Sequence, residues 1–232
     1  MVNNIVTHRE HKMQKSRNSF YQNDAWKEYE QRIEEKRKSI KRGPNVIHLE
    51  YLGDSFKIED INEFGIKAEE VGLVFSHYDK NGDMYANLDQ FELVSYLVIS
   101  APIITEFLKG IGTNMAWDAI KYILFEGIKK LRTKHYHRAT QNKVVEKKIS
   151  FGLKVNLDRN TSFNFELNGD LDDTTIQNSL DKILTFIGKQ KINEHYKLTD
   201  YVHFDKTSDE WVKIDVTEEI EKMSEEGKLN EK

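Results

Sequence analysis

Strict alternation of apolar and polar residues marks the segment between positions 149 and 167. The apolar members are Ile149, Phe151, Leu153, Val155 and Leu157 before the turn letters DRNT, then Phe163, Phe165 and Leu167 after them. Successive side chains of a strand point to opposite faces of a sheet. This pattern therefore predicts a β-hairpin with one buried face.

A helical period follows the hairpin. Its apolar positions recur at intervals of three and four and are Ile176, Leu180, Ile183, Leu184 and Ile187. Asp172 or Asp173 can cap this helix, and Gly188 ends it. The letters DYVHFDKTSDEWVKIDV, at 200–216, predict a second hairpin that leads into an acidic helix. Residues 149–232 are thus predicted to form a small α+β module of the order strand-strand-helix-strand-strand.

The centre of the chain is strongly apolar. Thirteen residues from Leu93 to Thr105 carry no charge, which is shorter than the roughly 20 residues that span a membrane. We interpret them as a buried helix kinked or broken at Pro102, with a membrane-interacting segment as the alternative. A helical stripe from Ala116 to Leu131 follows, so the two predict a helical pair joined near Gly110. The letters NVIHLEYLG and KAEEVGLVFSHYD favour strands before this pair.

A charged helix is predicted near the start of the chain, at residues 23–42. Its narrow apolar stripe consists of Trp26, Tyr29, Ile33 and Ile40, close to heptad spacing. So narrow a stripe buries little by itself and favours docking on the body of the protein, on a second copy or on a partner. With Trp117 of the central helix, these residues are the candidate partner-binding set.

The stretch FSHYDKNGDMYANLDQF, from Phe75 to Phe91, has two interpretations. It resembles an EF-hand calcium loop because Asp79, Asn81 and Asp83 alternate, but Met84 replaces the sixth-position glycine and Gln90 the bidentate glutamate. The alternative is a β-hairpin that turns at Asn81-Gly82, the preferred type I′ pair, with Asn87 capping the next helix. We favour the hairpin and keep the three alternating residues only as a weak calcium candidate.

Charge is distributed unevenly along a chain of net charge −4. Residues 1–43 hold eleven Lys and Arg against six Asp and Glu, residues 128–154 nine against one, and residues 205–232 five against ten. The basic 128–148 segment makes a nucleic-acid partner a minority interpretation. The absence of cysteine and of a signal-peptide pattern favours a cytoplasmic protein.

Composition shifts divide the chain into four predicted regions. They are a basic arm with its charged helix (1–44), an α+β region with the central hydrophobic helices (45–132), a basic linker (133–148) and the α+β module with its acidic tail (149–232). The expected fold class is α+β.

The sequence contains no established catalytic signature. No G-x-S-x-G, P-loop, H-E-x-x-H or strand-linked G-x-G-x-x-G occurs, and His135 with His137 supplies two metal ligands where a site needs more. We therefore expect no cofactor and no metal. Asp170, Asp172 and Asp173 gather at a helix start, where carboxylates favour the helix dipole. Asp118 is a functional polar group, an ion-pair partner of Lys121 or part of an exposed turn of helix.

A turn into a hydrophobic helix, the letters NMAWDAIK and an alternating hairpin with a trailing helix resemble small bacterial proteins, some of them carried on mobile or defence-related DNA. This resemblance spans Gly65 to Ile187 and identifies no site. The leading hypothesis is a non-enzymatic interaction or regulatory protein with a protein partner or self-association. The alternatives are a small effector hydrolase or nuclease whose acids meet only in the fold, and a peripheral membrane protein.

Overall fold

The computed structural model describes residues 24–81, 93–110, 114–134, 136–139, 144–147, 149–167, 171–191 and 199–214. The chain divides into two compact units, Met1–Ile40 and Lys41–Lys232. The first contains helix α2 (Asp24–Lys38), which ends four residues earlier than the sequence predicts. The basic residues Lys36, Arg37 and Lys38 occupy its last turn, where they favour the helix dipole.

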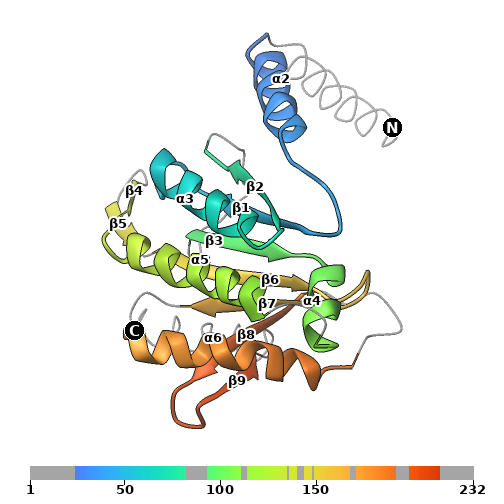
Figure 1. Cartoon of the computed structure of the whole chain (residues 1–232). Helices are drawn as coiled ribbons and strands as arrows, with labels where there is room; N and C mark the ends of the chain where they lie inside the picture. Colours follow the sequence, from blue (N-terminus) through green and yellow to red (C-terminus); the bar gives the residue numbers. More distant parts are fainter. Residues whose placement is uncertain are drawn as a thin grey trace, which may run out of the picture. The chain divides into compact units, whose positions relative to one another are not determined.

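The main sheet of the second unit is mixed and has seven strands (Figure 1). Its strands, in the spatial order β2-β1-β3-β6-β7-β8-β9, are β2 (Val74–Asp79), β1 (Val46–Tyr51), β3 (Leu93–Ile99), β6 (Ile149–Asn156), β7 (Ser162–Leu167), β8 (Asp200–Asp205) and β9 (Glu210–Lys213). The pairs β1-β2, β3-β6 and β7-β8 are parallel, and the other neighbours are antiparallel. One sheet thus joins strands from both predicted α+β regions.

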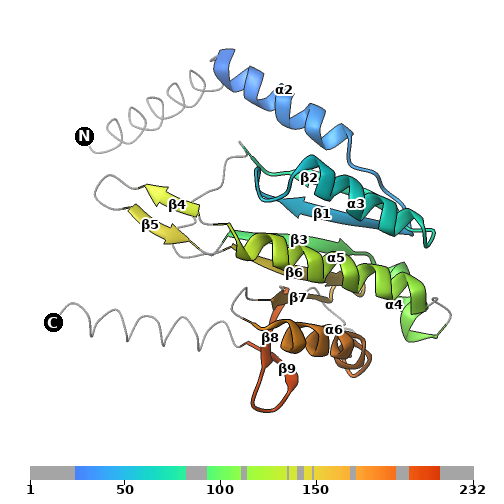
Figure 2. The same ribbon diagram turned by 60° about the vertical axis from the view of Figure 1, so that its left-hand side comes forward.

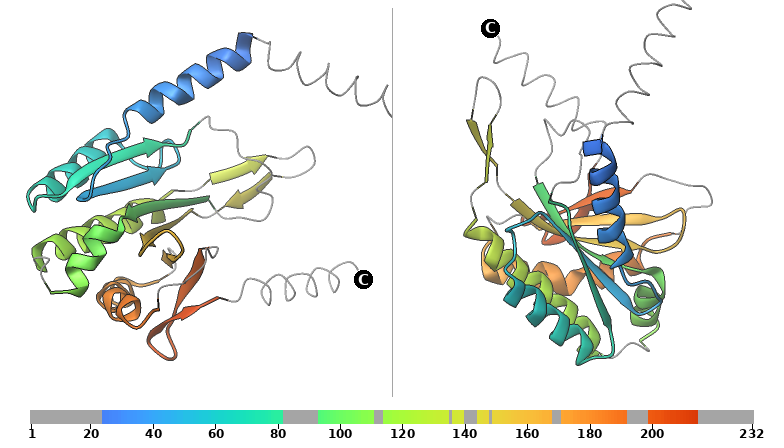
Figure 3. Two further views of the ribbon diagram at one scale, coloured as in Figure 1. Left: turned by 90° about the vertical axis from the view of Figure 1, so that its right-hand side faces the viewer. Right: turned by 90° about the horizontal axis from the view of Figure 1, so that it is seen from above.

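Four helices cover one face of this sheet. They are α3 (Ile58–Glu69), α4 (Ala101–Leu108), α5 (Asn114–Arg132) and α6 (Asp173–Gly188). Figure 2 shows them on the same side of the strands, and the view from above in Figure 3 agrees. α5 packs on β6, α3 on β2 and α6 on β9. Along the described strands, the opposite face carries no helix of this unit.

The core lies between the helices and the strands. Alternate strand residues enter it with almost no exposed surface: Ile47, Leu49, Leu97, Ile99, Phe151, Leu153, Val155, Phe163, Phe165 and Val202. Aromatic rings meet edge to face at its centre, with Phe165 and Trp211 5.0 Å apart between ring centroids. The alternation seen in the sequence is therefore the inward face of the sheet.

The connection from β7 through α6 to β8 has an unusual hand. β1-α3-β2 and β3-α4-α5-β6 are right-handed crossovers, the rule in about 98% of such units. β7 runs in the direction of β1 but its parallel neighbour lies on the opposite side, so a helix on the same face makes this crossover left-handed. A right-handed connection would place α6 over the other face of the sheet. Because the connection is left-handed, α6 does not cover that face.

Several predicted elements are confirmed. The α+β class, the strand at Val46, the β6-β7 hairpin, α6 and the β8-β9 hairpin all form where the pattern indicates them. Asp172 is the N-cap of α6, and its carboxylate accepts a 2.9 Å hydrogen bond from the Thr175 backbone N–H. The predicted acidic helix after residue 214 lies outside the described residues.

The apolar run Leu93–Thr105 corrects the prediction of a buried helix over its whole length. Its first half is β3, and α4 begins only at Ala101. A strand flanked by two others and covered by helices can be charge-free, which mimics a buried helix. Pro102 lies in the first turn of α4, where its missing N–H costs no hydrogen bond. The helix predicted to start at Asn87 does not extend to residue 93, where β3 begins.

Two further elements were not predicted. The segment interpreted as a basic linker contains an antiparallel pair, β4 (Tyr136–Ala139) and β5 (Val144–Lys147). α3 precedes β2, and its buried residues Ile61, Phe64 and Ala68 follow a helical period. No helix in the described part of the chain combines the length and the apolarity that crossing a membrane requires.

Candidate functional site

The helix-free face of the sheet places a row of side chains across four neighbouring strands. The register pairs Glu50 of β1 with Tyr96 of β3, Tyr96 with Gly152 of β6, and Gly152 with Glu166 of β7. A second row lies beside it, formed by His48, Val98, Lys154, Asn164 and Tyr201. Two carboxylates therefore flank a tyrosine at the middle of the sheet. We call these two rows the sheet-face site.

Gly152 lets the Tyr96 ring lie against the sheet. A Cβ atom at position 152 would stand 2.7 Å from Cε1 of Tyr96 and 2.8 Å from the carbonyl oxygen of Phe165. Real Cβ atoms do not approach other atoms so closely, so only glycine fits under the ring. The backbone of β6 thus fixes the tilt of the aromatic group at the centre of the sheet-face site.

Lys80 occupies the Glu50 side of this tyrosine. Its Nζ lies 2.6 Å from Oε2 of Glu50 and 5.9 Å from the centroid of the Tyr96 ring. The backbone N–H of Lys80 donates a 2.7 Å hydrogen bond to the Tyr51 carbonyl, which anchors the residue just after β2. A cation held between a carboxylate and an aromatic face is favourable on both sides.

Glu166 lies on the other side of Tyr96 and has a different partner. The Ser150 hydroxyl donates a 2.8 Å hydrogen bond to its Oε1. Burial raises the pKa of the Tyr96 phenol, and the negative potential of Glu166 with the neighbouring Tyr201 and Glu50 raises it further. Tyr96 is consequently a neutral phenol at physiological pH.

The second row holds two buried polar atoms that have no hydrogen-bond partner in the described part of the chain. Asn164 is 6% exposed and its Oδ1 accepts nothing, and Nδ1 of His48 is also unpaired. Burial lowers the pKa of His48, and the positive Lys80 adds to this effect while Glu50 opposes it. An unsatisfied buried acceptor costs about 1–3 kcal/mol, so the Asn164 oxygen marks a place for a donor.

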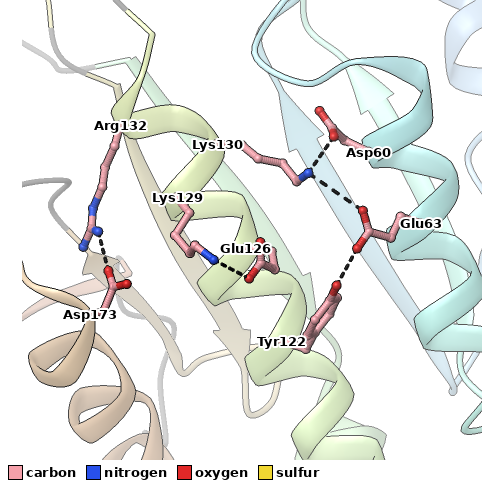
Figure 4. Close-up of polar contacts among 8 residues, drawn as sticks. All are labelled: Asp60, Glu63, Tyr122, Glu126, Lys129, Lys130, Arg132 and Asp173. Atoms are coloured by element: carbon pink, nitrogen blue, oxygen red, sulfur yellow. Dashed lines mark hydrogen bonds and ion pairs between the residues drawn. The ribbon is translucent and has the colours of Figure 1, made fainter.

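A separate polar cluster ties the helices together (Figure 4). Lys130 of α5 lies 2.7 Å from Asp60 and 3.8 Å from Glu63, both on α3. The Tyr122 phenol donates to Glu63, and this hydrogen bond is the main reason why the pKa of Tyr122 rises to about 12. Arg132 reaches α6 through the Asp173 carboxylate. The cluster therefore clamps α5 between its two neighbours.

The described cations of the basic 128–148 segment are engaged inside the protein. Lys129 pairs with Glu126, Lys130 with Asp60, and Arg132 with Asp173 and the Leu171 carbonyl. Lys134 donates a 2.9 Å hydrogen bond from Nζ to the Asp54 carbonyl. These four side chains have partners within the protein, and the side chains of residues 135–148 lie outside the described part of the chain, so the nucleic-acid interpretation stays a prediction.

The candidate partner-binding residues lie in two places. In α2, the rings of Trp26 and Tyr29 are 5.3 Å apart and Ile33 is buried, while Ile40 follows the end of the helix. Trp117 of α5 is 7% exposed and its ring lies 5.7 Å from that of Phe107. It is a core residue, so contact with a partner would require the helical layer to open.

The calcium candidate is only partly described. Phe75–Asp79 is strand β2, where an EF-hand would have its incoming helix. The Asp79 carboxylate accepts a 2.7 Å hydrogen bond from the Asn81 backbone N–H, which is turn chemistry. Asp83 and the expected second strand lie outside the described residues. Among the described residues, no group of three or more His, Asp or Glu is placed to hold a metal ion.

Sequence reasoning missed the sheet-face site altogether. Its members come from strands far apart in the chain and meet only through the register of the sheet. The sole local signal is the alternation in β7, where Asn164 and Glu166 are the outward positions between Phe163, Phe165 and Leu167. Asp118, by contrast, pairs with Lys121 at 3.1 Å and is exposed, which agrees with two of its three predicted roles. Comparisons of this chain with protein-family models, with curated proteins and with solved structures find no match.

Proposed function

We propose that this chain is a non-catalytic interaction protein and that the sheet-face site binds a protein partner. The observation that carries the proposal is the buried Asn164 oxygen, which has no donor among the described residues. It is set among half-buried aromatic and charged side chains on a face that no described helix of this unit covers. Tyrosine and other aromatic residues are enriched in protein interfaces, where one end of the ring is buried and the hydroxyl stays polar.

The ordinary alternative is a sheet face that only contacts water. Antiparallel sheets commonly have one such face, and its outward side chains are then well solvated. Tyr96 departs from this expectation because burial is the main cause of its raised pKa. Asn164 departs from it as well, because water would satisfy an exposed amide. Both features suit a surface that is completed by another molecule.

The interaction proposal includes the predicted role of α2 without depending on it. Trp26, Tyr29 and Ile33 offer a second contact stripe in the first unit. The hydrolase alternative requires acids that meet in space. On the sheet face, Glu50 and Glu166 stand on strands three places apart, about 14 Å at the backbone. Asp60 and Glu63 of α3 do approach the same point, but Lys130 lies there as the ion-pair partner of both. A bacterial and defence-related origin stays a prediction.

A crosslinking experiment tests the proposal. A photoreactive phenylalanine derivative replaces Tyr201 on the sheet-face site, or Glu106 on the exposed side of α4 as the matched control. We expect irradiation in an extract of the source organism to give a discrete crosslinked protein from position 201 and none from position 106. Equal yields at both positions, or no product at position 201, would contradict the proposal.

A further inference from the structure

We propose that the partner inserts an arginine side chain into the sheet-face site, and that its guanidinium binds Glu166 and the Asn164 oxygen beside the rings of Tyr96 and Tyr201. This inference rests on the proposed interaction function and adds the chemistry of the contact. It names one occupant, a cationic side chain of a protein, on the basis of charge complementarity and of the unfilled acceptor.

Lys80 shows within the same chain how a cation binds this surface. Its ammonium contacts Glu50 at 2.6 Å and faces the Tyr96 ring at 5.9 Å. Glu166 lies on the other side of Tyr96, two strands away, and the Tyr96 ring covers the intervening Gly152. The described cations leave this half unfilled: the partner of Glu166 is the uncharged Ser150 hydroxyl. Glu166 thus places a negative charge beyond the Tyr96 ring that no described cation pairs with.

The Asn164 oxygen selects the kind of cation. Asn164 and Glu166 are two residues apart on β7, so they face the same side at a spacing of about 7 Å along the strand. A guanidinium carries five N–H donors in one plane, and this fork can serve a carboxylate and a nearby amide oxygen together. An ammonium is a compact point charge and reaches one of them well. Arginine also stacks on aromatic rings, and Tyr201 is directly opposite Asn164 in the register.

Lys154 disfavours a bound cation at this place, so its removal tests the direction of the change in affinity. It lies opposite Asn164 on β6, on the same face. Its positive charge repels an incoming guanidinium, so its removal is expected to tighten binding, whereas removal of the Glu166 charge is expected to weaken it. A merely structural role of these residues would not produce opposite effects from the two substitutions.

The probe is a blocked tripeptide, acetyl-Gly-Arg-Gly-amide, titrated into the full-length protein and followed by NMR. Its matched controls contain lysine or the uncharged citrulline in place of arginine. We expect the arginine peptide to cause saturable shifts in the NMR signals of Asn164, Tyr96 and Tyr201. The lysine peptide should bind at least threefold more weakly, and the citrulline peptide should not bind. Equal binding of lysine and arginine, or no shift at these residues, would overturn the inference.

Three variants complete the design. Glu166→Gln keeps an acceptor for Ser150 but removes the charge, and we expect about tenfold weaker binding of the arginine peptide. Lys154→Gln should bind it about threefold more tightly, and Glu106→Gln, the same charge change on the helical layer, should bind it as the parent does. Unchanged affinity in Glu166→Gln counts against the inference, because that variant retains the packing.

The two proposals can fail separately. A partner crosslinked at position 201 while the arginine peptide produces no shift would leave the interaction function standing and reject the guanidinium. Binding of the peptide without any crosslinked protein would keep the chemistry of the site and reject the protein partner. Binding of a polyamine more tightly than the arginine peptide would also reject the inference, because it would assign the site to a free amine.

Discussion

At the scale of single residues, Asn164 is the position where stability and binding should conflict. Its buried oxygen has no donor among the residues that the structure describes, and an apolar side chain of similar size removes the cost of that unpaired acceptor. We expect Asn164→Leu to raise the free energy of unfolding by about 1 kcal/mol in urea titrations, while it abolishes crosslinking from position 201. Asn156→Leu, a half-buried residue on the same face, should change stability by less than about 0.5 kcal/mol. A marked loss of stability in Asn164→Leu would show that the amide is satisfied.

Two glycines should respond in opposite directions to the same substitution. Gly152→Ala forces a Cβ against the Tyr96 ring and the Phe165 carbonyl, and we expect a loss of about 1–3 kcal/mol. Gly65 lies inside α3, where a Cβ would stand at an ordinary 3.5 Å from Phe75. Gly65→Ala should therefore gain up to about 1 kcal/mol from helix propensity. Thermal unfolding of both variants measures the difference, and stability gained by Gly152→Ala would refute the position assigned to Tyr96.

At the scale of elements, the α3-α5 contact depends on one mostly buried ion pair. The Lys130 and Asp60 side chains are 27% and 17% exposed. Lys130→Met should lower the free energy of unfolding by about 1–2 kcal/mol, because Asp60 then loses its charged partner. Lys129→Met on the same helix breaks a more exposed pair with Glu126 and should cost about 0.5 kcal/mol or less. Equal losses in the two variants would show that the clamp adds nothing.

The same pair should make the protein sensitive to acid. Burial works to raise the pKa of Asp60, but hydrogen bonds from Lys130 and from the Lys57 backbone outweigh it and lower the pKa below 3.8. The stabilisation is therefore complete above that pH and is lost as the pH falls through the lowered value. We expect Asp60→Asn to be less stable than the parent at pH 6 and to differ from it less at pH 2. Urea titrations at the two pH values give the comparison, and a constant difference would contradict it.

Helices and strands were predictable from the sequence where one of their faces is buried and the other is exposed to solvent. β6, β7 and α6 satisfy this condition, so their periods of two and of three to four residues are clear. β3 does not, because its run from Leu93 to Ile99 is apolar on both faces and has no visible period. The sheet-face site was beyond reach, since no local pattern reveals that Glu50, Tyr96 and Glu166 become neighbours.

At the scale of the whole molecule, the left-handed β7-α6-β8 connection determines what the protein can present. The rule of right-handed crossovers would place α6 over the outward side chains of β7 and β8, which include Asn164, Glu166 and Tyr201. Its position on the other face adds α6 to the helical layer, where Lys121 pairs with Asp181 at 2.7 Å. The uncommon connection thus places all four helices of this unit in the described part of the chain on one face of the sheet and none of them on the other.

The central position of β3-β6 pairing leads to a prediction for unfolding. Composition divides 45–132 from 149–232, but β3 of the first region and β6 of the second are parallel neighbours along seven residue pairs, from Leu93↔Ile149 to Ile99↔Val155. Neither half can lose this pairing without exposing its own core to water. We therefore expect the residues from Lys41 onward to unfold in one cooperative transition.

Two tryptophans make this expectation measurable, because they report from opposite sides of the predicted boundary. Trp117 lies in α5, and Trp211 of β9 donates a 2.8 Å hydrogen bond from its indole to the Ser179 carbonyl. Single-tryptophan variants that keep one or the other, with phenylalanine elsewhere, should give urea midpoints that coincide with each other and with far-UV circular dichroism. Separate midpoints for the two reporters would instead establish the domain division that composition predicts, and would mean that the sheet can open between β3 and β6.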